Sequence, residues 1–224
     1  MRLSPRTIGF RSIVGSLLLA MLMASAPSPV SAATINVPDD YSTIQAAIDA
    51  ASGGDTIVVK DGTYTEDLTI GTSLTIQSVN GPTTTSIVAA SSGSPAVTIS
   101  DVTDVTLDGF AVSGGSIGVR LTSKTTGVTL TDLAVTNADG TGISLDGSHT
   151  YVVIMDSTIG GTPKTGVYLS GELAHVQIED VAITGTTTCG IHKPPDSTLS
   201  DISIAEVDVT PSAGPGICLE DSTA

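Results

Sequence analysis

A repeat of fixed length constrains the fold of this chain more than any other feature. Three short patterns recur between Val128 and Ile191, and each moves forward by 24 residues. The first is an aliphatic triplet, the second opens on an acid and the third opens on glycine. They begin at Val128, Val152 and Val176, at Asp132, Asp156 and Asp180, and at Gly142, Gly166 and Gly190, respectively. A fixed period of this length is typical of a solenoid.

Each triplet has aliphatic residues at its ends and a different residue in the middle, which is the alternation of a half-buried strand. Three strands and three turns in each 24-residue unit predict one coil of a parallel β-helix. The density of Thr, Val and Gly disfavours helical repeats. Two Phe and no Trp suit a narrow aliphatic core. We expect about five to six such coils over residues 57–219.

Residues 43–51 are predicted to form the one helix after residue 32. Ile44, Ala47 and Ile48 share a face, Ser42 or Thr43 can cap the start, and two glycines follow the end. A helix in this place covers the open end of a solenoid. We therefore assign 33–56 to an N-terminal strand and capping helix, and 220–224 to a short tail. The last coil would expose strand edges and core, so we expect that another subunit covers it or that the chain is a truncated part of a longer protein.

The first 32 residues have the order of a secretory signal peptide. Three arginines precede an apolar run at 13–23, and small residues allow cleavage after Ala32 or, alternatively, after Ala26. No second long apolar run follows, so we expect no membrane span after cleavage. Cleavage after Ala32 removes three of the eight Lys and Arg and none of the 23 Asp and Glu, which leaves a net charge of −18.

This charge excludes nucleic acid as a partner, because the phosphate backbone would be repelled. A polyanionic ligand would need a local basic site or a bound metal. The signal peptide predicts a secreted or cell-surface protein, or a periplasmic one in a Gram-negative cell. Cys189 and Cys218 could then form a disulfide, but along an extended strand they differ by one coil and about three residues. At ~4.8 Å per coil and ~3.3 Å per residue, this exceeds the ~7 Å limit between Cα atoms, so the register argues against a bond.

The opening segment Ile35–Ala51, followed by Gly54–Val59 and Gly62–Glu66, resembles the start of right-handed parallel β-helix proteins. These form the pectin-lyase-like superfamily, which includes archaeal and bacterial surface proteins and the periplasmic NosD-type proteins. Together with the repeats, the resemblance covers 34–219 and implies a right-handed parallel β-helix of three-strand coils. It implies no single activity, because this scaffold carries lyases, hydrolases, esterases, epimerases and adhesins.

The enzymes of this superfamily have motifs that are missing here. The resemblance to pectin methylesterases would require a Gly-Arg-Pro-Trp-like motif, but the chain has no Trp and one Arg after residue 32, Arg120. The Gly-His-Gly and Arg-x-Lys motifs of polygalacturonases are absent as well. A calcium-dependent polysaccharide lyase needs acids that hold Ca²⁺ and an Arg or Lys as base. That alternative stays open.

The middle residues of the glycine-led strands are expected to form an outward column. The column consists of Arg120, Ser144, Tyr168, His192 and Cys218. In a lyase Arg120 would be the base and Tyr168 a surface that stacks on sugar. However, Arg120 and His192 would lie three coils apart, about 14 Å, so they could not act on one bond. The alternative is a mixed, solvated face.

Lys193 takes a position that leucine fills in the three preceding coils. A buried ammonium is costly, so either the strand ends early and Pro194-Pro195 turn Lys193 outward, or a polar pocket opens. We favour the first; the pocket would include His192, Lys193 and Asp196. The catalytic candidates are therefore Arg120, His192 and Lys193. The binding candidates are Arg120, Tyr168, His192 and Asp196.

The acids of the repeat share one register, which comprises Asp132, Asp156, Asp180 and Glu206. Carboxylates stacked at ~4.8 Å repel by roughly 3–4 kcal/mol at an effective dielectric of ~20. One explanation is that Asp suits a tight turn and tolerates left-handed backbone, and we favour it. The other is a Ca²⁺ column with these four residues as ligands, although no Asp-x-Asp-x-Asp loop accompanies it.

These features predict a non-catalytic extracellular or cell-surface module that binds carbohydrate, in the form of a polysaccharide, or a cell-surface protein. The alternative is a Ca²⁺-assisted polysaccharide lyase or another carbohydrate-active enzyme. A cleft in which basic and acidic side chains converge would separate the two hypotheses.

Overall fold

The computed structural model describes residues 31–161, 164–210 and 213–221. These residues form one helix, α1 (Ile44–Ala50), and sixteen strands. The strands are β1 (Thr34–Val37), β2 (Thr56–Val59), β3 (Gly62–Thr65), β4 (Leu68–Ile70), β5 (Thr75–Ser78), β6 (Thr85–Val88), β7 (Val97–Asp108), β8 (Ala111–Ser113), β9 (Ile117–Thr131), β10 (Ala134–Thr136), β11 (Thr141–Gly160), β12 (Thr165–Thr184), β13 (Cys189–Lys193), β14 (Thr198–Ala205), β15 (Asp208–Thr210) and β16 (Ile217–Leu219). Nearly all of the expected signal peptide, 1–32, lies outside the described residues. Within them, no helix is long and apolar enough to cross a membrane.

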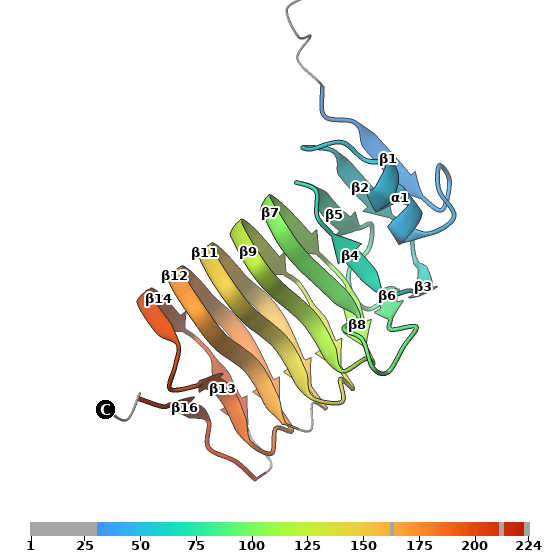
Figure 1. Ribbon diagram of the computed structural model, residues 1–224. Coiled ribbons are helices and arrows are strands. Elements are labelled where there is room, and N and C mark those ends of the chain that lie inside the picture. The colour runs from blue at the N-terminus through green and yellow to red at the C-terminus, as the bar shows by residue number, and fades with distance from the viewer. Residues whose placement is uncertain (1–30, 162–163, 211–212, 222–224) are drawn as a thin grey trace, which may run out of the picture. The chain divides into compact units, whose positions relative to one another are not determined.

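The strands stack in parallel, coil upon coil. One side of the stack follows the order β1, β2, β5, β7, β9, β11, β12 and β14, and Figure 1 shows the long strands of this series side by side. Val128, Val152 and Val176 are direct neighbours, as the 24-residue period predicts. The parallel β-helix is confirmed. The solenoid has about eight turns, so the expected five to six is wrong, because β1, β2 and β5 stack without an evident repeat in the sequence.

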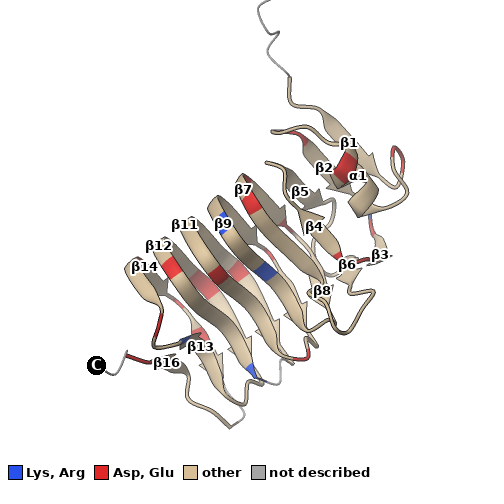
Figure 2. Cartoon of the chain, in the orientation of Figure 1, with Lys and Arg blue, Asp and Glu red and all other residues tan. Residues whose placement is uncertain are grey.

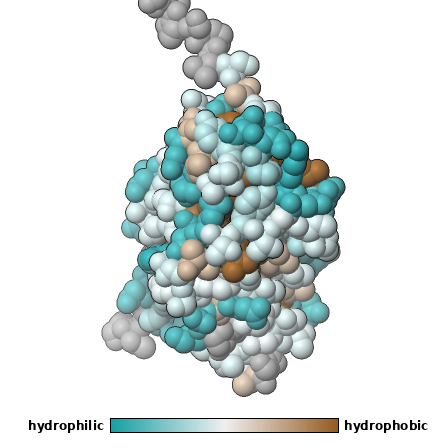
Figure 3. Space-filling view, turned by 90° about the vertical axis from the view of Figure 1, so that its right-hand side faces the viewer, coloured by the Kyte–Doolittle hydropathy of each residue, from teal (hydrophilic) through white to brown (hydrophobic). Residues whose placement is uncertain are grey.

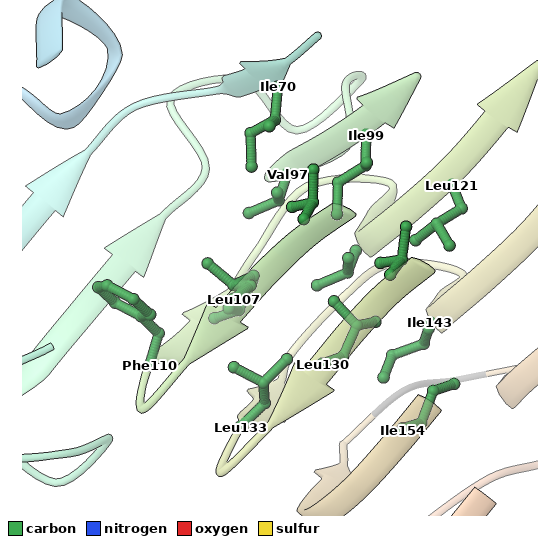
Figure 4. Close-up of a cluster of buried hydrophobic side chains, with 14 of the residues drawn as sticks. Ile70, Val97, Ile99, Leu107, Phe110, Leu121, Leu130, Leu133, Ile143 and Ile154 are labelled. Atoms are coloured by element: carbon green, nitrogen blue, oxygen red, sulfur yellow. The ribbon is translucent and has the colours of Figure 1, made fainter. Parts of the chain in front are cut away.

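Aliphatic ladders fill the interior of the coils. Leu107, Leu130, Ile154 and Ile178 are neighbours in successive coils, and all four are 0 % exposed. Figure 4 shows such side chains pointing from successive strands into one shared interior. Burial of one of them stabilises the fold by about 1.5–3 kcal/mol. The ladders therefore supply much of the stability of the stack, and each coil depends on its neighbours.

The helix α1 packs on the first coils. Its N-cap residue, Thr43, accepts a hydrogen bond from the backbone N–H of Ala46 (3.2 Å). The Glu66 carboxylate accepts two more, from the N–H groups of Ile44 (3.0 Å) and Gln45 (2.9 Å), which satisfies donors that a helix start leaves free. Ile44, Ala47 and Ile48 are buried. The predicted helix is confirmed, and it lies beside β1 and β2 in Figure 1.

Cys189 and Cys218 form a disulfide, with Cα atoms 6.0 Å apart. The expectation that they stay unbonded is wrong. The estimate assumed an extended strand, but Cys189, Gly190 and Ile191 are buried one after another, so the side chains do not alternate and the strand bends at Gly190. Gly166 holds the same position one coil earlier, and a Cβ added there would point inward and contact the Ile183 side chain. The bend at this glycine shortens the distance between the Cα atoms of Cys189 and Cys218, which an extended strand overstates.

Candidate functional site

The outward column predicted from the sequence exists in the structure. Thr98, Arg120, Ser144, Tyr168, His192 and Cys218 are neighbours in successive coils. Arg120 and Tyr168 are half-buried and point away from the aliphatic core, while the residues on either side of them are buried. The column therefore places one polar side chain per coil on a single face of the solenoid.

A shallow groove of about 430 Å³ lies over this column. Its lining includes Arg120, Ser144, Asp146, Lys164 and Tyr168. Lys164 is exposed and forms no ion pair with a described residue. Figure 2 shows how sparse basic residues are among the acidic ones along the coils. Two basic side chains in one groove are therefore a marked local feature of this acidic chain.

Arg120 is held by an acid that the sequence did not single out. Its Nη2 lies 2.6 Å from Oδ2 of Asp146, and the side chains are 36 % and 46 % exposed. The Arg120 Nε–H is buried and has no acceptor among the described residues. Asp146 follows Ser144 by two residues, so the period of a strand places both on the same face. The two-residue alternation of a strand was therefore the sequence signal that could have placed Asp146 beside the outward column.

His192 and Lys193 lie at the end of β13. The strand ends at Lys193, whose Nζ donates to the backbone carbonyl of Glu220 (2.7 Å). The Lys193 ammonium is therefore hydrogen-bonded at the end of the strand, and the two alternatives for this residue stay predictions. His192 Nε2 lies 3.3 Å from Oε1 of Glu220, and its ring meets that of Tyr168 edge-on, with centroids 5.3 Å apart. Asp196 is exposed and forms no ion pair with a described residue, and its place in the pocket stays a prediction.

The acid register lies at a corner where the backbone is left-handed. The φ angles of Asp132, Asp156, Asp180 and Glu206 are 48°, 50°, 51° and 53°. Aspartate tolerates this conformation better than most residues, which accounts for the register as turn chemistry. A hydrogen bond with Asp180 and the charge of that carboxylate raise the pKa of Glu206. Among the described residues no group of three or more His, Cys, Asp or Glu could hold a metal ion, so the four metal candidates stay a prediction.

A second corner holds an arrangement that sequence reasoning missed. The rings of Tyr151 and His175 stack with centroids 4.6 Å apart and planes 4° apart. Nδ1 of His175 lies 2.5 Å from Oδ2 of Asp201. All three residues have positive φ, 56°, 53° and 54°. The available signal was the 24-residue period, which places Tyr151 and His175 in one register, but neither residue belongs to the three repeated patterns.

Comparisons with known proteins agree with the fold. The family described as "Periplasmic copper-binding protein (NosD)" matches residues 48–223. A cell surface glycoprotein of Methanothermus fervidus is 32 % identical over 124 residues, which cover 54 % of this chain and 20 % of that protein. The chain thus spans about a fifth of the length of this curated relative.

Solved structures with low sequence identity share the architecture. ORF18 of Geobacillus virus E2 has a TM-score of 0.64 at 16 % identity, covering 78 % of this chain and 41 % of that one. An alginate lyase from Paenibacillus sp. has a TM-score of 0.57 at 14 % identity, covering 81 % and 75 %. The pectin methyl esterase of the rice weevil has a TM-score of 0.54 at 14 % identity, covering 78 % and 64 %. At such identities the likeness shows the fold alone, which here is that of the pectin-lyase-like superfamily.

Proposed function

We propose that this chain, which belongs to the family described as periplasmic copper-binding protein (NosD), is a non-catalytic module of the periplasm or cell surface. We propose further that the module binds an acidic polysaccharide. The ligand lies along the groove over the outward column. The observation that carries this proposal is the presence of Arg120 and Lys164 in one groove.

The charge of the chain makes this groove distinctive. Residues 33–224 contain five Lys and Arg against 23 Asp and Glu, so most of the surface repels an anion. Two of these five basic residues line the groove: Arg120, whose charge Asp146 partly offsets, and Lys164, which forms no ion pair with a described residue. A carboxylated sugar chain would find its favourable electrostatic contacts there and few elsewhere.

The other groups of the groove suit carbohydrate. Tyr168 offers a half-buried ring with a polar tip, and aromatic side chains of this kind combine packing with a hydrogen bond. Thr141 is half-buried in the same lining, whereas Ser144 and Thr165 are each 4 % exposed, and the Thr141 hydroxyl can donate or accept. On the face shown in Figure 3, hydrophobic residues form small areas between hydrophilic ones.

The alternative, a Ca²⁺-assisted lyase, needs a cation beside a base. Among the described residues, no group of three or more His, Cys, Asp or Glu could hold the cation. Arg120 already pairs with Asp146. His192 lies three coils from Arg120, or about 14 Å. The geometry therefore supports binding better than bond cleavage.

Copper, which the family's description names, does not fit the described residues. Copper sites use imidazole and sulfur ligands. Cys189 and Cys218 are bonded to each other, His149 is buried against Thr125, and the other two histidines each face a carboxylate.

The test is binding of oligogalacturonates and alginate oligosaccharides by calorimetry. Lys164→Ala should weaken binding about tenfold, the size of one charge-assisted hydrogen bond. Lys124→Ala is the matched control, because Lys124 is an exposed lysine without an ion pair that lies outside this groove; it should bind like wild type. Equal losses in both variants would show diffuse charge attraction and no site. Formation of unsaturated product in the presence of Ca²⁺ would establish the lyase instead.

A further inference from the structure

The corner around Tyr151 is the most unusual part of the surface. Five positions are in register there in successive coils, namely Asp104, Gly127, Tyr151, His175 and Asp201. All five have positive φ, between 53° and 68°. Gly and Asp adopt this conformation readily, whereas a tyrosine there is a genuine outlier. Unfavourable backbone of this kind clusters at functional sites, so the ring of Tyr151 needs an explanation.

The contacts of Tyr151 fix its ring in one orientation. One face stacks on the imidazole of His175, and Asp201 in turn hydrogen-bonds to His175. The neighbouring position on the other side is Gly127, which has no side chain. Tyr151 is accordingly 56 % exposed. The carboxylate of Asp201 thus orients His175, His175 supports Tyr151, and the second face of the phenol ring is left open.

A hollow of about 310 Å³ runs beside this stack over three coils. It is lined by Tyr151, Val153, His175, Gln177, Asp201 and Ser203. The lining combines two aromatic rings with an amide, a hydroxyl and a carboxylate, and it contains no Lys or Arg. Its volume is at the lower end of the range for small-molecule sites.

We propose that this corner, here called the Tyr151 groove, binds a neutral saccharide. A sugar in the hollow packs an apolar C–H face against the edges of the Tyr151 and His175 rings, which line it. The amide of Gln177, the hydroxyl of Ser203 and the free carboxylate oxygen of Asp201 bond the sugar hydroxyls, which both donate and accept. A carboxylated sugar is disfavoured, because it would meet Asp201 with no basic residue in the lining. The proposal does not depend on the groove over Arg120, which lies on another face of the coils.

The experiment is a titration of the full chain with maltotriose, mannotriose and chitotriose, with trigalacturonate as the charged comparator. The chain has four Tyr and no Trp, so tyrosine fluorescence reports on the site, and the imidazole signals of His175 in NMR spectra report on it directly. We expect at least one neutral trisaccharide to shift the His175 signals. Trigalacturonate should leave them unchanged, whatever it does at Lys164.

Tyr151→Asn is the informative variant, because asparagine tolerates positive φ and lacks the ring. It should weaken binding of the neutral trisaccharide by about tenfold or more, as loss of a stacking ring does. Tyr151→Phe should keep most of the affinity. Tyr41→Asn removes another exposed tyrosine, 38 % exposed, and should bind like wild type.

Two results would overturn the proposal. The first is that no neutral trisaccharide shifts the His175 signals of the wild-type protein. This measurement does not depend on whether any variant folds. The second is that Tyr151→Asn, with an unchanged circular dichroism spectrum, binds as tightly as wild type. Neither result bears on binding of acidic saccharides at Lys164, so the two sites are tested separately.

Discussion

The middle coils and the last coil use the same ladders but differ in how well these are covered. Ile154, Ile178 and Ile204 occupy one ladder; the first two are 0 % exposed and Ile204 is 36 % exposed. Likewise Ile191 is 0 % exposed, whereas its neighbour Ile217 is 47 % exposed. Burial in a solenoid thus comes from the coils on both sides and not from the residue type.

The last coil has other supports that the middle coils lack. The Cys189–Cys218 disulfide ties it to the coil before, and the Lys193 ammonium is bonded to the Glu220 carbonyl. Within the described residues, these two links join the last coil to the coil before it. Matched substitutions in the middle coils and in the last coil test this contrast.

The largest effect is expected from Ile154→Ala. A fully buried isoleucine replaced by alanine costs about 2–5 kcal/mol in free energy of unfolding, because a cavity remains in a ladder that is packed on both sides. Ile204→Ala is the matched control in the same ladder and should cost less than about 1 kcal/mol. Urea unfolding followed by circular dichroism measures both. Equal losses would contradict the view that neighbouring coils determine the contribution.

The next effect is expected from the double variant Cys189→Ser/Cys218→Ser. Loss of the disulfide should lower the free energy of unfolding by about 2–4 kcal/mol. Because coils contact only their neighbours, amide exchange should quicken in residues 189–219 while β11 stays protected. Alkylation of both thiols in the native, unreduced protein would show that the bond is absent and would remove the contrast.

A smaller effect is expected from glycines at the bends. Gly166→Ala should cost about 1–3 kcal/mol, because the new Cβ would contact Ile183 and lie 2.6 Å from the Gly190 carbonyl oxygen. Gly190→Ala meets Val209 in the same way, but Val209 is only partly buried and can move, so its cost should be lower. Gly71→Ala, whose Cβ would have no neighbour nearer than 3.8 Å, is the control. A higher cost at Gly190 than at Gly166 would argue that the last coil is the more rigid one.

The sequence predicted the parts of the structure that repeat. The ladders through Val128 and Leu130 follow from the 24-residue period and from strand alternation, and so does the outward column of Arg120 and Tyr168. The period also sets the register between coils, because a shift by one residue would turn every aliphatic side chain outward. The turns before residue 97 were undercounted because their strands pair without repeating a pattern.

The sequence did not predict features that depend on bends and on side-chain reach. The disulfide was argued against because the chain was taken as extended through Gly190. The Arg120–Asp146 pair needs the guanidinium to reach the next coil, and the Tyr151–His175 stack needs a tyrosine in left-handed backbone. The period places the residues of both contacts in register, but whether two side chains in register meet depends on their rotamers and on the local backbone, which become visible only in three dimensions.

The smallest effect concerns pH and a polar pair inside the middle coils. Thr125 and His149 interrupt a ladder that is otherwise Val102, Leu173 and Leu199. His149 is 0 % exposed, the Thr125 hydroxyl lies 2.9 Å from its Nδ1, and its Nε2 has no partner among the described residues. Burial lowers the pKa of His149 from its ordinary value of 6.5. The folded chain therefore keeps the imidazole neutral where the unfolded chain takes up a proton.

Stability should consequently fall as the pH drops below about 6.5, because the unfolded state then binds the extra proton. The variant Thr125→Val/His149→Leu makes the ladder fully aliphatic and should remove this part of the decline. The raised pKa values of Asp108 and Glu206 act in the opposite direction, but they are common to both proteins and cancel in the difference. The measurement is the melting temperature of each protein at pH 7.5 and pH 5. If wild type and variant lose the same amount, the histidine is accommodated in its charged form, and the middle coils are less closed than their burial indicates.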